Sequence, residues 1–171
     1  MARNMKVEVL QAARQQAKTY DEWREISLEL DAHSGLDLWK IETASDHYHH
    51  ELLRERLLTL RQWQHSHNHK LLIRSLREGL HHDLGNMGNA KLYGRAHVGT
   101  KRLIEDYVDQ VCASLDYLCD ATIEHLTNDE KLALFEDILR SFGQPALQLS
   151  GGATLGMFHI GVCKALDEQG L

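Results

Sequence analysis

The sequence predicts a mostly helical protein, in which a helical N-terminal domain is followed by the first strand–turn–helix of an α/β domain. Apolar residues recur every three or four positions along most of the chain, which is the spacing of one helix face. Leu, Glu, Arg and Ala, which favour helices, are abundant, and Pro145 is the only proline. After Pro145 the pattern changes to a short apolar run and a cluster of glycines, which marks a second type of fold.

The first helix is predicted over residues 4–18, and the second lies between Thr19 and Gly35. Thr19-Tyr-Asp-Glu22 has the pattern of a capping box, in which the Thr19 hydroxyl accepts from the Glu22 N–H. Gly35 is expected to end the second helix, because glycine adopts a left-handed backbone without strain. The expected buried positions of both helices are Val7, Leu10, Ala13, Ala17, Trp23, Ile26 and Leu30.

A connector is predicted over residues 36–44, and Ser45 is expected to cap a third helix. A polar break at residues 65–69 separates this helix from a fourth. Because Trp23 and Trp63 lie on helical stripes, we expect them in the core, whereas Trp39 in the connector is the candidate for a membrane interface. The expected buried positions of the third and fourth helices are Leu53, Leu57, Leu60, Trp63, Leu72, Leu76 and Leu80.

Glycines at positions 85, 88, 94 and 99 predict a structured loop or a compact irregular lobe between Asp83 and Thr100. Two alternatives stand for the polar residues of this lobe. They contact a catalytic domain or a lipid, or they serve local turn chemistry. The residues concerned are Asn89, Tyr93, His97 and Lys101.

Thr100 is expected to cap a long helix with an apolar seam, and a second capping box, Thr127-Asn-Asp-Glu130, begins a last helix. Gly143 and Pro145 are expected to end that helix. The seam of the long helix is expected at Ile104, Val108, Val111, Leu115 and Leu118, and the stripe of the last helix at Leu132, Phe135, Leu139 and Phe142. We therefore place the helical domain at residues 1–143 and the start of a second domain at residues 146–171.

Charge and apolar content limit the partners and the location of the protein. The net charge of −6 argues against nucleic acid, because proteins that bind its phosphate backbone usually present a basic face. The N-terminus lacks the apolar stretch of a secretory signal, and no apolar run reaches membrane-spanning length. We expect a cytoplasmic protein that can lie peripherally on a membrane or lipid droplet. Cys112, Cys119 and Cys163 are expected to be small core residues in a reducing compartment.

The histidines raise the question of a metal site, because His65, His67 and His69 alternate along the chain and a second group is present at residues 81–83. On a helix, however, this spacing turns His67 away from His65 and His69. No Cys or carboxylate pair completes a site in the sequence. We therefore expect solvated histidines and no bound metal.

A glycine turn follows a predicted strand over residues 146–149. Ser150-Gly-Gly-Ala-Thr-Leu-Gly156 lacks the Gly-x-Gly-x-x-Gly spacing of a dinucleotide site and the Gly-Lys-Ser/Thr of a P-loop. Small residues ahead of a helix let several backbone N–H groups point at one spot, as an oxyanion hole requires. The candidate donors are Gly151, Gly152, Ala153 and Gly156. The alternative is an ordinary strand–helix connection.

This turn, followed by Phe158-His-Ile-Gly-Val-Cys-Lys-Ala-Leu166, resembles the opening of patatin-like lipases. Their pattern is Gly-Gly-Gly/Ala-x-x-Gly, then a helix close to His-Ile-Gly-Val-x-x-Ala-Leu. Leu155 departs from it, because many members carry Arg or Lys there. Residues 20–24, 36–40 and 89–107 resemble the helical domain that precedes the patatin-like domain in triacylglycerol lipases of yeast and plant seed, with bacterial relatives.

The resemblance implies hydrolysis of carboxylic esters of lipids, triacylglycerol above all, by a Ser–Asp dyad at a lipid surface and without a metal or organic cofactor. Gly161 is expected to support close helix–sheet packing and not the chemistry, and His159 is expected to be a surface or partly packed histidine.

The dyad of this family lies in Gly-x-Ser-x-Gly and in Asp-Gly, and the chain contains neither pattern. We therefore expect a fragment or an early-terminated reading frame that is inactive alone. The alternative is a non-catalytic helical module that binds lipid or protein.

Overall fold

The regular structure of the described residues is helical, as the sequence predicted for most of the chain. The computed structural model describes residues 2–79, 81, 83–124, 126–142, 147–149 and 156–168. Its elements are α1 (Ala2–Gln16), α2 (Tyr20–Ser34), α3 (Leu36–Ile41), α4 (His50–His65), α5 (His69–Gly79), η1 (Leu84–Asn86), α6 (Ala90–Tyr93), α7 (Arg102–Asp120), α8 (Asn128–Phe142) and α9 (Met157–Glu168).

The strand predicted over residues 146–149 is not seen in its described part. Residues 147–149 have no regular secondary structure, and residue 146 lies outside the described residues. A strand needs a neighbouring strand to bond its backbone groups, and the described part of the chain offers none.

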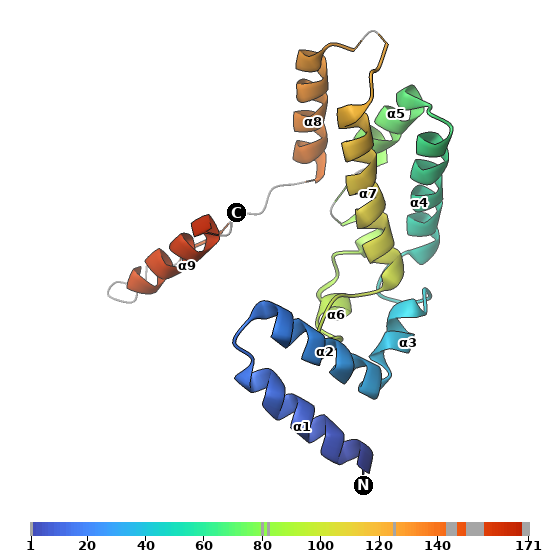
Figure 1. Ribbon diagram of the computed structural model, residues 1–171. Coiled ribbons are helices and arrows are strands. Elements are labelled where there is room, and N and C mark those ends of the chain that lie inside the picture. Colours follow the sequence, from blue (N-terminus) through green and yellow to red (C-terminus); the bar gives the residue numbers. More distant parts are fainter. Residues whose placement is uncertain are drawn as a thin grey trace.

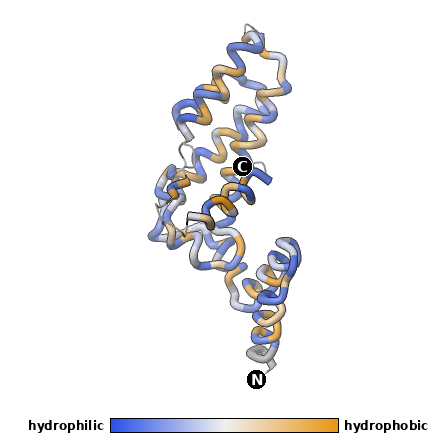
Figure 2. The backbone as a smooth tube through the Cα atoms, turned by 90° about the vertical axis from the view of Figure 1, so that its left-hand side faces the viewer, coloured by the Kyte–Doolittle hydropathy of each residue, from blue (hydrophilic) through white to orange (hydrophobic). Residues whose placement is uncertain are grey.

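The helices form two groups with a separate last helix. Figure 1 shows α4, α5, α7 and α8 at one end, and the antiparallel pair α1 and α2 at the other. The short elements α3 and α6 lie where the two groups meet, while α9 stands apart from both. Figure 2 shows apolar and polar residues alternating along the helices, which gives each helix of the bundle one face for the core.

The core is centred on the contact between α4 and α7. The seams predicted for these helices are confirmed. Leu53, Leu57 and Leu60 of α4 are buried, and so are Ile104, Val111 and Leu118 of α7, while Val108 and Leu115 are partly buried against them. Each fully buried side chain of this size contributes about 1.5–3 kcal/mol relative to an exposed one. The α4–α7 contact is therefore the main apolar source of stability.

Three predicted helix boundaries are confirmed by their hydrogen bonds. The Thr19 hydroxyl accepts from the Glu22 N–H at 3.2 Å, and the Glu22 carboxylate accepts from the Lys18 N–H at 2.9 Å. Gly35 ends α2 with a φ of 73°. Thr127 and Glu130 bond reciprocally at 3.3 and 2.8 Å, as a capping box does.

The connector predicted over residues 36–44 is wrong over most of its length, because residues 36–41 form α3. Gly35 ends α2 and also precedes α3, so one left-handed residue turns the chain directly from one helix into the next. Trp39 therefore lies on a helix and is only 9% exposed. Its predicted contact with a membrane interface is wrong, because the indole is part of the core.

Two predicted caps are also wrong. Ser45 accepts from the His47 N–H at 3.2 Å within a local turn, and α4 is instead capped by His49, whose Nδ1 accepts from the Leu52 N–H at 3.1 Å. The Thr100 hydroxyl donates to the Leu92 carbonyl at 3.0 Å, and the residue before α7 is Lys101. A local turn thus takes the Ser45 hydroxyl away from the helix start, and a buried bond to the end of α6 takes that of Thr100.

The predicted core cysteines are on the surface, because Cys112, Cys119 and Cys163 are all exposed. Cys112 and Cys119 do share a face of α7, as their spacing predicted, but α7 turns its Ile104, Val111 and Leu118 face into the core.

The buried stripe of α8 differs from the predicted one. Leu134 and Ile138 are buried, whereas Leu132 and Leu139 are 60% and 57% exposed. Phe135 is partly buried, and the side chain of Phe142 is not described. Apolar residues cover two adjoining faces of α8, so their spacing alone is ambiguous, and packing against α5 selects the face of Ile138.

Replacing neighbouring residues of α8 tests this register. Ile138→Ala is expected to lower the free energy of unfolding by about 2–5 kcal/mol, because it removes a fully buried side chain. Leu139→Ala is expected to change it by no more than about 1 kcal/mol. Urea denaturation followed by circular dichroism measures both values. If Leu139→Ala lowered the free energy of unfolding more than Ile138→Ala does, the buried stripe predicted from the sequence would be the correct one.

Candidate functional site

The N-terminus of α9 is the described part of the predicted oxyanion turn. Gly151, Gly152 and Ala153 lie outside the described residues, whereas Gly156 directly precedes α9. A Cβ added at Gly156 would meet no atom within 4 Å among the described residues. Free N–H groups at a helix N-terminus can bind an oxyanion through hydrogen bonds and the helix dipole.

Helix α9 exposes much apolar surface. No residue of it is buried, and Met157, Phe158, Ile160 and Val162 are all exposed. A helix that is apolar on several sides normally lies inside a protein. The close packing predicted at Gly161 is not present among the described residues, because a Cβ added there would meet no atom within 4 Å.

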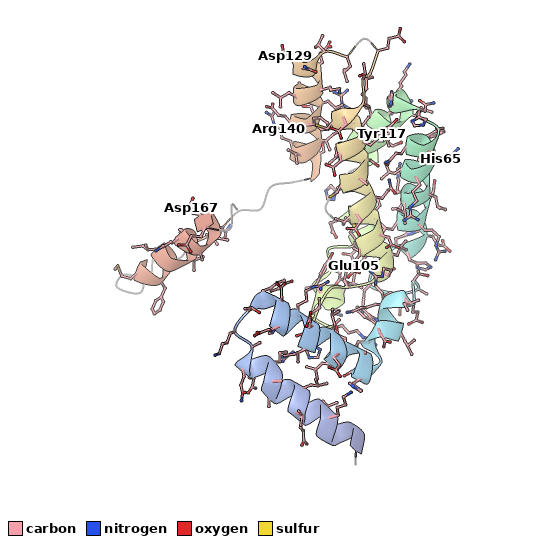
Figure 3. The ribbon with its side chains drawn as sticks, viewed as in Figure 1. His65, Glu105, Tyr117, Asp129, Arg140 and Asp167 are labelled. Atoms are coloured by element: carbon pink, nitrogen blue, oxygen red, sulfur yellow. The ribbon has the colours of Figure 1, made fainter. Side chains whose placement is uncertain are left out.

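An open hollow lies along one side of α9. It has a volume of about 500 Å³ and is lined by Leu149, His159, Ile160, Cys163, Lys164 and Asp167. His159 is partly exposed, which agrees with the partly packed histidine that we predicted. Figure 3 places Asp167 near the end of α9. The hollow therefore follows the helix side and not its N-terminus.

A second cluster of charged groups is buried around Asp31 on α2. Asp31 is 1% exposed, and its carboxylate has four donors. Oδ1 accepts from the backbone N–H of His97 at 2.9 Å and lies 2.7 Å from its Nδ1. Oδ2 accepts from Lys40 Nζ at 2.8 Å and from the Val98 N–H at 3.3 Å. Burial acts to raise the pKa of Asp31, but the bonds from Lys40, His97 and Val98 outweigh it and lower the pKa.

Lys101 is the second buried charge, and it is 1% exposed. Its Nζ donates to the carbonyl groups of Trp39 at 2.8 Å and Glu42 at 2.7 Å, which lie at the C-terminal end of α3. The ammonium also lies 4.5 Å from the centroid of the Trp39 ring. Burial lowers the pKa of Lys101, while the charge of Glu42 opposes that shift. The lysine thus stabilises the end of a helix dipole and fixes the indole.

The structure gives three of the four polar residues of the glycine-rich lobe a role in the fold. His97 binds Asp31, and Lys101 is buried. Asn89 caps α6, because its Oδ1 accepts from the Lys91 N–H at 3.0 Å. Asn89 thus serves local turn chemistry. His97 and Lys101 instead bind residues 66 and 62 positions away, and Tyr93 remains half exposed.

The prediction that helical spacing separates His67 from His65 and His69 does not apply, because His67 is not on a helix. His67 lies in the turn between α4 and α5 with a φ of 52°, so it does not follow helix geometry. Its Nδ1 lies 2.7 Å from the Tyr117 hydroxyl, and His69 Nε2 lies 2.9 Å from the same oxygen. Figure 3 shows Tyr117 on α7 and His65 at the end of α4. The described residues hold no group of three or more His, Cys, Asp or Glu side chains suited to a metal ion.

Replacing Asp31 tests the buried cluster. Asp31→Asn is expected to lower the free energy of unfolding by about 3–5 kcal/mol, because Lys40 loses its buried counter-charge. Asp109→Asn, at an exposed position of α7, is the control and is expected to change it by less than about 0.5 kcal/mol. Chemical denaturation measures both, and equal values would show that the cluster contributes no stability.

The lowered pKa of Asp31 predicts a pH dependence with a definite sign. A carboxyl with a folded-state pKa below its ordinary value of 3.8 stabilises the fold fully above that value, and the contribution is lost as pH falls through the folded-state pKa. The difference in free energy of unfolding between wild type and Asp31→Asn should therefore shrink with acidification in this range. A difference that grows on acidification contradicts the assignment.

Comparison with known proteins relates the chain to lipases. The family described as "Domain of unknown function (DUF3336)" matches residues 1–140. Triacylglycerol lipase ptl3 of Schizosaccharomyces pombe is 41% identical over 155 residues, which are 91% of this chain and 32% of that protein. Triacylglycerol lipase SDP1L of Arabidopsis thaliana is 38% identical over 91% of this chain and 19% of its own length.

The similarity extends through the glycine turn. Triacylglycerol lipase 4 of Saccharomyces cerevisiae is 32% identical over 169 residues, or 99% of this chain and 18% of that protein. Other relatives are named as patatin-like phospholipase domain-containing proteins. The chain spans a third or less of the length of these curated relatives. No solved structure matches it. No helix among the described residues is long and apolar enough to cross a membrane.

Proposed function

This chain belongs to the DUF3336 domain family, and we propose that it is the N-terminal part of a patatin-like lipase that hydrolyses carboxylic esters of lipids. Residues 1–143 form the helical domain in this proposal, and residues 146–171 begin the catalytic domain. Triacylglycerol is the proposed substrate. The main support is the similarity to triacylglycerol lipases, which covers 99% of the chain in one case and so includes the glycine turn.

The turn supplies the oxyanion hole in this proposal. The backbone N–H groups of Gly151, Gly152 and Ala153, with Gly156 at the start of α9, bind the oxygen of the scissile carbonyl as it becomes negative. Each such donor is worth about 10²–10³ in rate, because its dipole is in place before charge develops. The position of Gly156 directly before α9 fits this role, because the first N–H groups of a helix have no partner within it.

The nucleophile is a serine of a Gly-x-Ser-x-Gly segment, with an Asp that precedes Gly as its base. Neither pattern occurs among these 171 residues. The serine oxygen attacks the ester carbonyl while its proton passes to the Asp carboxylate. The tetrahedral intermediate collapses, the alcohol leaves with that proton, and water then releases the fatty acid from the acyl-serine. No step calls for a metal or an organic cofactor.

The reaction takes place at a lipid surface, because triacylglycerol does not dissolve in water. We propose a cytoplasmic protein that contacts a membrane or lipid droplet peripherally. The exposed apolar residues of α9 are available for burial by the rest of a catalytic domain.

An ester-hydrolysis assay tests the proposal. The 171-residue chain alone is expected to show no turnover of a triacylglycerol emulsion, whereas a protein that joins it to a Gly-x-Ser-x-Gly segment is expected to hydrolyse the emulsion. In that longer protein Gly152→Val should lower kcat by about 10²–10³, because it displaces an oxyanion donor. Gly94→Ala is the matched control, since Gly94 has an ordinary φ of −87°.

The assay also separates the lipase from the other candidate, a helical module that binds lipid or protein without catalysis. Turnover by the 171-residue chain alone would contradict the proposed role of an external serine. The module would be favoured if the coding sequence continues past Leu171 without a Gly-x-Ser-x-Gly segment and the protein nevertheless binds lipid.

A further inference from the structure

A hollow opens between α5 and the connection from α7 to α8, on different elements from the proposed oxyanion turn. Its volume is about 540 Å³. Small-molecule sites are typically about 300–1,000 Å³. The proposed function leaves this hollow without a role.

The floor of the hollow is apolar. Ile73 of α5 and Ile123 and Leu126 of the α7–α8 connection line it. All three are partly buried and pack against the main core cluster. The core is thus exposed to a ligand at this place, and an acyl chain would find an apolar surface there.

The rim of the hollow carries three cations along one face of α5. Lys70, Arg74 and Arg77 follow each other at steps of four and three on α5, so they lie on one helix face together with Ile73. Among the described residues no acidic side chain lies within ion-pair distance of Lys70. A ligand with an anionic end and an apolar chain matches these three cations and the apolar floor.

The acidic residues of the rim leave the cations available. Arg74 Nε lies 2.8 Å from Glu78 Oε1, and both side chains are exposed, so this pair is weak. The bond uses Nε alone and leaves the two terminal nitrogens of Arg74 for another carboxylate. Arg77 pairs with Asp137 at 3.5 Å, which is a long contact. With Glu78 and Glu124 on the rim and Asp137 paired to Arg77 all counted, three cations meet three acids. The anion would therefore bind on the α5 face, where Lys70 has no ion pair among the described residues.

We propose that this hollow binds a long-chain fatty-acid anion. The carboxylate lies on Lys70, Arg74 and Arg77, and the acyl chain lies over Ile73, Ile123 and Leu126. The choice of a fatty acid among anionic amphiphiles rests on the proposed function, because ester hydrolysis releases this product. The site then retains or senses product on the helical domain, away from the ester.

Calorimetric titration of the 171-residue chain with monomeric oleate tests the proposal. Oleate is expected to bind at one site, and methyl oleate, which has no charge, is expected to bind at least about tenfold more weakly. Arg74→Ala and Arg77→Ala are each expected to raise the Kd for oleate about tenfold, since each removes a charged hydrogen bond.

Arg140→Ala is the matched control, because Arg140 is an exposed helical arginine that pairs with Glu136 four residues away, as Arg74 does with Glu78. Figure 3 shows Arg140 on α8. The Kd of Arg140→Ala for oleate should stay within about twofold of wild type. Circular dichroism verifies that each variant is folded.

Three results would overturn the proposal: no binding of oleate, equal Kd values for all variants, or arginine-dependent binding to anionic phospholipid vesicles in the absence of oleate binding. Because binding is measured without turnover, a failed ester assay leaves this result unaffected, and the two proposals fail separately.

Discussion

A buried carboxylate and a buried ammonium hold together segments that are distant in the sequence. Asp31 on α2 joins Lys40 on α3 to the loop at His97 and Val98, and Lys101 binds the carbonyl end of α3. Each charge has lost its water and is tolerated because groups of opposite polarity surround it. Together they fix the glycine-rich lobe against α2 and α3, and thereby set α1 and α2 relative to the α4–α7 bundle.

The two proposed contacts with lipid use different physics. In the proposed function, the turn before α9 supplies backbone N–H groups, which suit a charge that exists only during the reaction and leave no permanent ion pair to break. The hollow beside α5 offers full cationic side chains over an apolar floor, which suit a charge that persists. A transient oxyanion and a stable carboxylate are therefore assigned to separate parts of the chain.

Local signals predicted most of the helices. Thr19, Gly35 and Thr127 act at helix ends as predicted, because a cap depends on a few neighbouring atoms. Spacing could not decide the stripe of α8, which only the packing of α5 selects. The role of Asp31 was not visible either, because the imidazole of His97 that binds it comes from 66 positions further along the chain. Of the candidate oxyanion donors, the structure places Gly156 at a helix start, and the other roles remain predictions.

The burial of Lys101 also has a chemical consequence. Lysine side chains react with acylating reagents through the free, uncharged amine, and the reagent must reach the nitrogen. Both bonds from Nζ to carbonyl oxygens and the Trp39 ring beside it close that route. Lys101 can therefore be acylated only when the lobe detaches from α3, so the rate at which this one lysine is labelled reports how often the N-terminal helices separate from the bundle.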